Sequence, residues 1–229
     1  RVPKPWSPLQ VIRKKTGCEV KCTGRTYRFS GSSFLESVTT RDAEVLASPV
    51  TLFGRVDGRM LRLEGKRIKV LAEDPDSVEL EHRLRGQGLE VVVRTHVSFD
   101  GVIRYDWSMA AERAVEVDSL GIEIRLPSKH AEYLYHFPGI WGNAKNAGAM
   151  PDEPQRLGFR PYIWIGDDQR GLAWFSESDR GWYPPADGIV TEIKPGSRHV
   201  TLRLHLISQR LTLRSASERP ADWLATPVL

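Results

Sequence analysis

Six carboxylates in the second half of the chain come nearest to acid–base chemistry by type and spacing: Asp152, Glu153, Asp167, Asp168, Glu177 and Asp179. Paired carboxylates hydrolyse glycosides because one donates a proton while the other stabilises or attacks the sugar cation. Asp167 and Asp168, however, occupy positions where a tight turn uses Asp to accept backbone hydrogen bonds. Asp152 and Glu153 lie between two prolines in a polar loop. We therefore predict turn and loop roles for these pairs and no catalytic residue.

Two loops carry the residue types that bind carbohydrate. An aromatic ring stacks on the apolar face of a sugar, while Asn, Asp and Arg bind its hydroxyl groups. The alternative is that the tryptophans of these loops only close the ends of the core. The predicted carbohydrate-binding residues are Trp141, Asn143 and Asn146 in the first loop and Asp179, Arg180, Trp182 and Tyr183 in the second.

The sequence predicts no metal site and no cofactor. Cys18 and Cys22 are the only cysteines. On one strand they would lie roughly 13 Å apart, too far to form a disulfide without a turn between them. Zinc needs four ligands, and no histidine is near these two. The two thiols are therefore predicted to have no special role. No phosphate-binding glycine loop and no HExxH motif is present either.

The bulk composition is that of a soluble globular protein, with 229 residues, 40% hydrophobic content and 27% charged content. The formal charge is +4, and the 33 Lys and Arg are scattered among 29 Asp and Glu. The absence of a basic stripe argues against nucleic acid as a partner. No run of about eighteen apolar residues exists, so no segment is predicted to span a membrane.

The elements that must position these loops are strands, and the clearest are two runs that form a hairpin, Tyr162–Gly166 and Gly171–Glu177. Both runs are apolar on both faces, which is typical of strands buried between two layers. With residues 167–170 as the turn, Ile163 should pair with Trp174 and Trp164 with Ala173. We expect this hairpin in the middle of a sheet.

A second hairpin can be predicted to the level of its register. A two-residue turn at Asp100-Gly101 would put core and solvent residues on one face, and a three-residue loop from Phe99 to Gly101 corrects this. Val97 should then pair with Ile103, Thr95 with Tyr105, Val93 with Trp107, Val91 with Met109, and Arg94 with Asp106.

Many short strands with regular turn signals predict an all-β fold, a large two-sheet antiparallel β-sandwich of supersandwich type with little helix and at least twelve strands. Residues 1–16 are predicted as an extended lead-in, 17–222 as the sandwich domain, and 223–229 as the start of a linker to a further domain. Because the first residue is Arg1 and the last segment carries no cap or tail, we expect a segment of a longer protein.

Several stretches resemble a known family: residues 133–139 (YLYHFPG), residues 163–182 (IWIGDDQRGLAWFSESDRGW), the closing Ala-Thr-Pro-Val at 225–228 and, in addition, Val97–Trp107 and Asp118–Leu126. They resemble the N-terminal β-sandwich domain of bacterial proteins related to glycoside hydrolase family 123, over roughly residues 90 to 229. The resemblance implies a sandwich that precedes a (β/α)₈ barrel. In that family the barrel is associated with substrate-assisted hydrolysis of N-acetylgalactosaminides by an adjacent Asp-Glu pair. Asp152-Glu153 matches that pair by letter only, so no catalytic role is carried over.

The expected function is that of a non-catalytic module of a secreted carbohydrate-active protein, extracellular or periplasmic in location. Its expected partners are the downstream catalytic barrel of the same polypeptide and a glycan. One alternative is a self-contained glycoside hydrolase or polysaccharide lyase with its site in the 141–146 and 178–183 loops. The other alternative is a structural or protein-interaction spacer.

Overall fold

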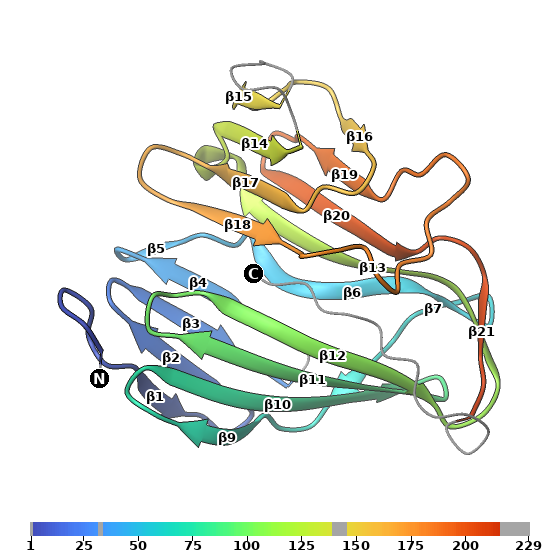
Figure 1. The fold of residues 1–229 in the computed structure, drawn as a ribbon, viewed down its shortest axis with the longest axis horizontal. Coiled ribbons are helices and arrows are strands. Elements are labelled where there is room, and N and C mark those ends of the chain that lie inside the picture. Colours follow the sequence, from blue (N-terminus) through green and yellow to red (C-terminus); the bar gives the residue numbers. More distant parts are fainter. Residues whose placement is uncertain (1, 32–33, 139–145, 216–229) are drawn as a thin grey trace.

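The computed structural model describes residues 2–31, 34–138 and 146–215, and within them the chain is almost entirely β (Figure 1). The only helical element there is a 3-10 turn, η1 (Ser128–His130), where the sequence allowed one helical turn. The strands are β1 (Gln10–Arg13), β2 (Cys18–Cys22), β3 (Arg25–Phe29), β4 (Ser37–Thr40), β5 (Ala43–Glu44), β6 (Ser48–Val56), β7 (Arg59–Met60), β8 (Glu64–Gly65), β9 (Lys69–Glu73), β10 (Ser77–Gly86), β11 (Leu89–Ser98), β12 (Ile103–Ala111), β13 (Val115–Pro127), β14 (Tyr133–Phe137), β15 (Ala147–Ala149), β16 (Gln155–Leu157), β17 (Tyr162–Gly166), β18 (Gly171–Phe175), β19 (Thr191–Lys194), β20 (His199–Ile207) and β21 (Leu211–Leu213).

These strands form an antiparallel sandwich-like fold, which confirms the predicted all-β class. The strands divide among four hydrogen-bonded sheets, however, where the sequence predicted two. One sheet is β1-β2-β3-β4-β5, a second is β12-β11-β10-β8 with β9 paired to β10, a third is β16-β19-β20-β13-β6-β7 with β21 paired to β13, and the fourth is β15-β14-β17-β18. The extra sheets arise because the N-terminal strands β1 to β5 pair only with one another, as do β14, β15, β17 and β18.

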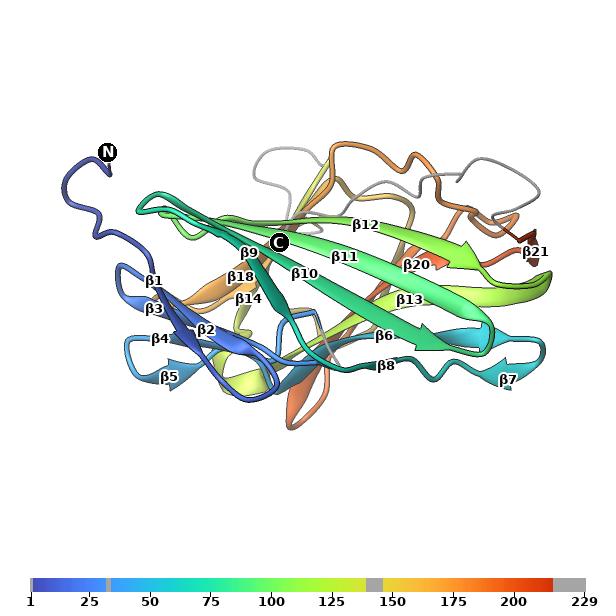
Figure 2. The ribbon, with the colours of Figure 1, turned by 90° about the horizontal axis from the view of Figure 1, so that it is seen from below.

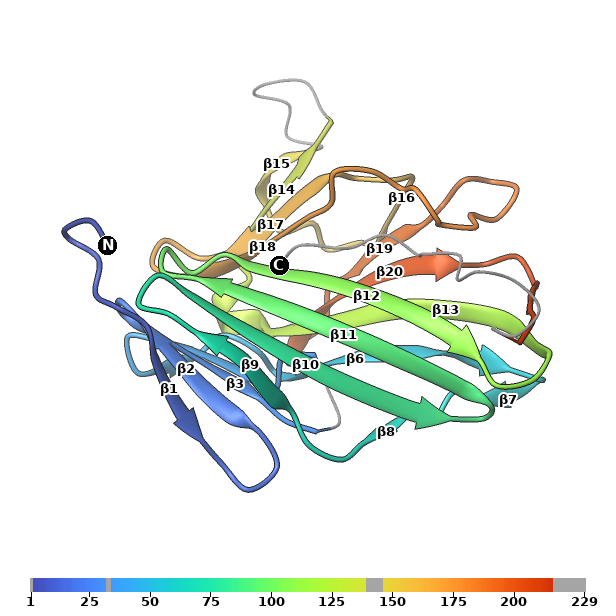
Figure 3. The same ribbon diagram turned by 60° about the horizontal axis from the view of Figure 1, so that its bottom comes forward.

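The core lies where the β10–β12 sheet crosses the sheet that contains β6, β13 and β20 (Figures 2 and 3). Alternate residues of β10, β11 and β13 point into it, so Val78, Val91 and Ile124 are fully buried. Most of the residues between them are polar and partly or fully exposed, with the buried Glu81 as an exception. This alternation gives each long strand one wet face, as expected for an antiparallel sheet.

The β11–β12 hairpin has the predicted register. Val97 pairs with Ile103, Thr95 with Tyr105, and Arg94 with Asp106. Ser98 N–H donates to the Val102 carbonyl at 2.9 Å, which closes the three-residue loop, and Gly101 adopts a left-handed φ of 92°. The prediction was therefore correct in loop length and in the residue that carries the positive φ.

The β17–β18 hairpin also has the predicted register, with Ile163 opposite Trp174 and Trp164 opposite Ala173. Its predicted place in the middle of a sheet was wrong, because β18 is the edge strand of a four-stranded sheet. The two-faced apolarity arises from two different environments. One face, with Ile163 and Trp174, is buried in the core, whereas the other carries aromatic rings that are only partly covered.

The N-terminal region holds two strands that the sequence did not predict, β1 and β4. β1 lies inside the segment predicted as an extended lead-in and pairs with β2 along its full length. Each has only four residues, QVIR in β1 and SVTT in β4, which is too short to show a clear alternation of apolar and polar residues. The predicted linker at 223–229 lies outside the described residues.

Candidate aromatic binding face

The outer surface of the four-stranded sheet β15-β14-β17-β18 is covered by aromatic side chains. Two rows of direct cross-strand partners run across β14, β17 and β18, and the members of each row face the same side of the sheet. One row is Phe137, Tyr162 and Phe175, and the other is Tyr135, Trp164 and Ala173. Tyr133 continues the same face along β14, two residues before Tyr135. We call the set Tyr133, Tyr135, Phe137, Tyr162, Trp164 and Phe175 the aromatic face.

The rings of the aromatic face remain accessible to solvent. Phe137 is 50% exposed and Tyr162 is 36% exposed. Tyr135 and Tyr162 pack edge to face with their ring centroids 5.9 Å apart, and Trp164 is partly exposed. Neighbouring rings thus support one another while each keeps part of its surface free.

The indole of Trp164 lies close to the backbone of two glycines. A Cβ atom added to Gly166 would come within 2.6 Å of the indole Cζ2, and one added to Gly171 would lie 2.9 Å from the indole Nε1. The two glycines are direct partners at the end of the β17–β18 hairpin, so any side chain there would occupy the place of the ring. The indole is therefore held by the turn end of its own hairpin, which preorganises it for stacking.

Polar groups surround this end of the hairpin. Asp167 accepts the backbone N–H of Gln169 at 2.7 Å and of Arg170 at 2.8 Å, and its other oxygen lies 2.8 Å from His130 Nδ1. Burial raises the pKa of Asp167, but these hydrogen bonds outweigh it and hold the pKa below its usual range. Asp168, by contrast, is exposed.

A hollow of about 320 Å³ runs beside the edge strand β18, next to the aromatic face. Trp164, Phe175 and Arg170 line it on the hairpin side, and Arg25, Thr40 and Val102 are among the residues on the opposite side. Its volume is at the lower end of the range for small-ligand sites. The hollow brings two guanidinium groups and a hydroxyl beside exposed rings, a combination of apolar and hydrogen-bonding surface that suits a sugar ring.

The carboxylates singled out in the sequence do not form an acid–base pair around this face. Asp167 is engaged by turn amides, as the turn interpretation predicted. Asp152 and Glu153 are exposed in the link between β15 and β16. Within the described residues, no three His, Cys, Asp or Glu side chains are grouped so that they could hold a metal ion.

The predicted carbohydrate-binding residues that the structure describes differ in their exposure. Trp141 and Asn143 lie outside the described residues. Asn146 is buried, and its Nδ2 donates to the His136 carbonyl at 3.4 Å. Asp179 and Arg180 are exposed on the loop after β18.

The other two residues of that loop point in different directions. Trp182 is buried and packs against Phe159 at 5.4 Å and Trp174 at 6.2 Å between ring centroids. This packing favours the alternative in which Trp182 closes the end of the core. Tyr183 is exposed, and its backbone pairs with Ile207. No contact tests sugar binding by these residues, and that role stays a prediction.

The aromatic face itself was missed in the sequence, although a signal for it exists. Tyr133, Tyr135 and Phe137 alternate along one strand, and Tyr162 and Trp164 alternate along its neighbour. Alternation places such residues on one face. Only the pairing of β14 with β17 shows that the two sets lie side by side, and that pairing joins segments separated by a long connection.

The two thiols have the environment of structural residues. Cys18 and Cys22 are not joined in a disulfide, and Cys18 is buried in β2. Burial raises the pKa of Cys18 to about 11, so the thiol is protonated at neutral pH and is a poor nucleophile.

No helix among the described residues is long and apolar enough to cross a membrane.

Comparison with known proteins adds three findings. A family model described as "Glycoside hydrolase 123, third domain" matches residues 13–180. This match confirms the relation to glycoside hydrolase family 123 that the sequence suggested, and it begins far earlier in the chain than the resemblance did. The order of domains in the parent protein stays a prediction. No curated protein matches the chain.

Among solved structures, a protein from Escherichia coli K12 named provisionally as an aldose 1-epimerase is 10% identical, with a TM-score of 0.50 and 97% of each chain covered. The Slr1438 protein from Synechocystis sp. PCC 6803 is also 10% identical, with a TM-score of 0.47 over 99% of this chain and 94% of that chain. At this identity the first likeness shows a shared fold and no shared activity.

Proposed function

Because the chain belongs to the glycoside hydrolase 123 third-domain family, we propose that it is a non-catalytic module whose aromatic face contacts glycan. The module belongs to a secreted carbohydrate-active protein and packs against the catalytic barrel of the same polypeptide. Its task is to hold or extend the glycan that the barrel cleaves.

The observation that carries this proposal is the seating of Trp164. An exposed aromatic residue in a soluble domain normally has conformational freedom, which binding must remove at a cost in entropy. Here Gly166 and Gly171 fix the indole against the hairpin backbone while part of the ring stays exposed. Tyr135 and Tyr162 pack against each other and extend the aromatic face beyond the indole. Rigid rings that already face solvent suit the apolar faces of successive sugar units.

The polar groups beside the rings support a binding role in preference to a catalytic one. Hydrolysis by two carboxylates requires both to face the same glycosidic bond. Asp167 is held by backbone amides at 2.7 and 2.8 Å and by His130, and its neighbour Asp168 points into a solvated turn. The hydrogen bond with Glu132 raises the pKa of Tyr133, which keeps its hydroxyl neutral and able to bind hydroxyl groups.

A direct test compares two tryptophan variants in the full chain. Trp164→Ala removes the seated ring, and Trp6→Ala removes another partly exposed tryptophan, which packs on Phe99 and is not part of the aromatic face. Binding is measured by affinity electrophoresis in gels that contain neutral polysaccharides, including galactosaminide polymers with N-acetyl groups. We expect retardation of the wild type, about tenfold weaker binding for Trp164→Ala, the effect of losing one stacking ring, and no change for Trp6→Ala.

Equal retardation of the wild type and Trp164→Ala would remove the aromatic face from the proposal. A second assay addresses the hydrolase alternative: the chain alone should not turn over aryl glycosides. Turnover that is abolished by Asp168→Asn or Asp179→Asn would establish a self-contained enzyme instead.

A further inference from the structure

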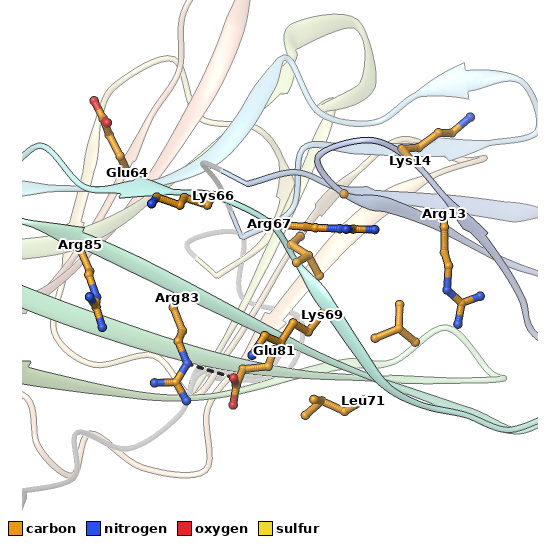
Figure 4. A pocket seen from close by; sticks show the side chains of 13 residues that line it. Arg13, Lys14, Glu64, Lys66, Arg67, Lys69, Leu71, Glu81, Arg83 and Arg85 are labelled. Atoms are coloured by element: carbon orange, nitrogen blue, oxygen red, sulfur yellow. Dashed lines mark hydrogen bonds and ion pairs between the residues drawn. The ribbon is translucent and has the colours of Figure 1, made fainter.

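A second hollow lies on a different part of the molecule, where the β1–β2 hairpin approaches β8, β9 and β10. It has a volume of about 700 Å³. Figure 4 shows Arg83 and Arg85 on one side of it, Arg13 and Lys14 on the other, and Arg67 and Lys69 between them. We call this hollow the basic groove.

The basic groove concentrates the positive charge of the chain. Its lining contains seven Lys and Arg against two Glu: Arg13, Lys14, Lys66, Arg67, Lys69, Arg83 and Arg85 against Glu64 and Glu81. The excess of five positive charges exceeds the +4 of the whole chain. The fold thus gathers into one hollow basic residues that are scattered along the sequence.

Only some of these cations are neutralised by neighbours. Arg13 pairs with Glu73 at 2.9 Å, and Arg85 pairs with Glu90 at 2.7 Å. Lys66 and Arg67, by contrast, form no ion pair or side-chain hydrogen bond with any described residue. Two unpaired cations in one hollow repel each other, and an anion bound between them would relieve that repulsion.

A carboxylate fixes the geometry of the groove wall. Glu81 is only 7% exposed and accepts a hydrogen bond from Arg83 Nε at 3.0 Å, with Arg94 Nε 3.8 Å away. The hydrogen bond from Arg83 lowers the pKa of Glu81 despite its burial, and nearby Lys69 acts in the same direction. Glu81 thus stays ionised and holds the Arg83 guanidinium in the wall.

The groove continues beyond this wall. A neighbouring hollow of about 610 Å³ on the outer face of β10–β12 shares Leu71, Glu81 and Arg83 with it and is lined further on by Arg94, His96 and Arg104. The two together form a track whose cations come from several strands. A track of this kind matches a polymer that carries anionic groups at intervals better than it matches a single small anion.

We propose that the basic groove binds an acidic polysaccharide, a glycan chain that carries sulfate or carboxylate groups. The choice of a glycan rests on the function proposed above. The exposed Leu71 and the partly covered Val70 give the lining an apolar strip for sugar C–H groups. None of the described residues that line the basic groove is aromatic, and Trp107 in the neighbouring hollow is buried, whereas single-stranded nucleic acid binds by stacking its bases on exposed aromatic rings.

The test removes the charges of the 66–69 segment in the full chain. The triple variant Lys66→Gln, Arg67→Gln, Lys69→Gln is compared with Arg59→Gln, Lys129→Gln, Arg156→Gln, which removes the same charge from exposed positions outside the groove. The probes are dextran sulfate and polygalacturonate, with uncharged dextran of matched length and duplex DNA as comparisons. Binding is measured by isothermal titration at several salt concentrations.

We expect at least one of the two acidic polymers to bind, with an affinity that falls as the salt concentration rises. Uncharged dextran should not bind. The groove triple variant should bind about tenfold more weakly and with a smaller salt dependence, because fewer counterions are released. Which polymer binds more tightly distinguishes sulfate from carboxylate as the preferred group. Equal losses in the two triple variants, or no binding even at low salt, would overturn the proposal, as would tighter binding of duplex DNA. None of these outcomes depends on Trp164. A negative result for the basic groove can therefore be distinguished from a negative result for glycan binding at the aromatic face.

Discussion

Trp174 shows how much one side chain contributes to this fold. It is fully buried, stands opposite Ile163 and contacts the ring of Trp182. Its indole N–H is buried without a hydrogen-bond partner among the described residues. The large apolar area of the ring therefore outweighs the cost of one unpaired donor.

Trp174→Ala should lower the free energy of unfolding by about 3–5 kcal/mol, the cost of deleting a large buried aromatic. Trp174→Phe should cost clearly less, because it removes the unpaired N–H together with part of the ring. Urea denaturation of the three proteins measures both differences. An unchanged midpoint for the Ala variant would contradict the burial of this residue.

His82 makes stability depend on pH. The side chain is buried, and Nε2 lies 2.6 Å from the Gly31 carbonyl, to which it must donate, so the neutral ring carries its proton on Nε2. Burial lowers the pKa of His82 below its value in the unfolded chain, although the Gly31 carbonyl partly opposes this. Between the two pKa values the unfolded state binds a proton that the folded state does not, so unfolding becomes easier as pH falls.

We therefore expect the free energy of unfolding to decrease as pH falls below about 6.5, the ordinary histidine pKa. His82→Gln should be less stable at pH 7.5 but should lose less stability on acidification. His205→Gln is a second test of the same linkage: burial lowers the pKa of this partly buried histidine too, so its removal should also reduce the loss of stability on acidification. Urea titrations from pH 7.5 to 5 compare the slopes, and an identical slope for wild type and His82→Gln would contradict the assignment.

At the scale of elements, the β11–β12 loop joins two sheets. Arg25 NH1 donates to the Asp100 carbonyl at 2.9 Å, and the Tyr27 hydroxyl donates to the Gly101 carbonyl at 2.9 Å. Both donors belong to β3, so the loop is held by the neighbouring sheet. Burial raises the pKa of Tyr27 to about 12, which keeps this hydroxyl a donor throughout the physiological range.

Gly101→Ala should destabilise the protein by about 1–3 kcal/mol, because its φ of 92° is strained for Ala and a Cβ there would overlap Arg25 and Tyr27. Gly24→Ala is the control: its φ of 73° is also positive, but no atom lies within 4 Å of the added Cβ. The difference between the two variants in urea denaturation measures the packing of the loop on β3. Equal losses would mean that only backbone strain matters at position 101.

The elements also show what sequence reasoning could and could not reach. Register was predictable in both hairpins because a shift by one residue would place core residues such as Val97 in solvent. The position of β18 within its sheet was not predictable. Trp164 and Phe175, on the outer face of the β17–β18 hairpin, are as apolar as buried residues, so the sequence does not show that this face is partly exposed or that β18 is at the edge. The aromatic face needs the pairing of β14 with β17, and the basic groove needs the approach of the β1–β2 hairpin to β8, β9 and β10; both join segments that lie far apart in the sequence.

At the scale of the whole molecule, β13 is the strand on which the large sheet depends. It pairs with β6 on one side and with β20 and β21 on the other. The family match ends at residue 180, before β19 begins. A fragment cut at that point would lack every partner on one side of β13.

A fragment of residues 1–180 should therefore fail to fold cooperatively, because Leu120, Ile124 and Leu126 would lose the strands that bury them. Its expected behaviour is aggregation or a broad, weak unfolding transition. The matched control is residues 1–215, which keeps every described strand and should unfold in one sharp transition. Circular dichroism and size-exclusion chromatography distinguish the two, and a monomeric 1–180 with a sharp transition would contradict the central role of β13.

The pairing of β13 with β20 also limits when the large sheet can form during synthesis on the ribosome. Glu123 and Arg203, whose side chains meet at 2.7 Å across these strands, are separated by 80 residues. A ribosome that adds roughly 5–20 residues per second delivers the second of them about 4–16 s after the first. During that interval one edge of β13 has no partner strand for its backbone N–H and C=O groups, so the large sheet cannot be completed before translation has delivered β20.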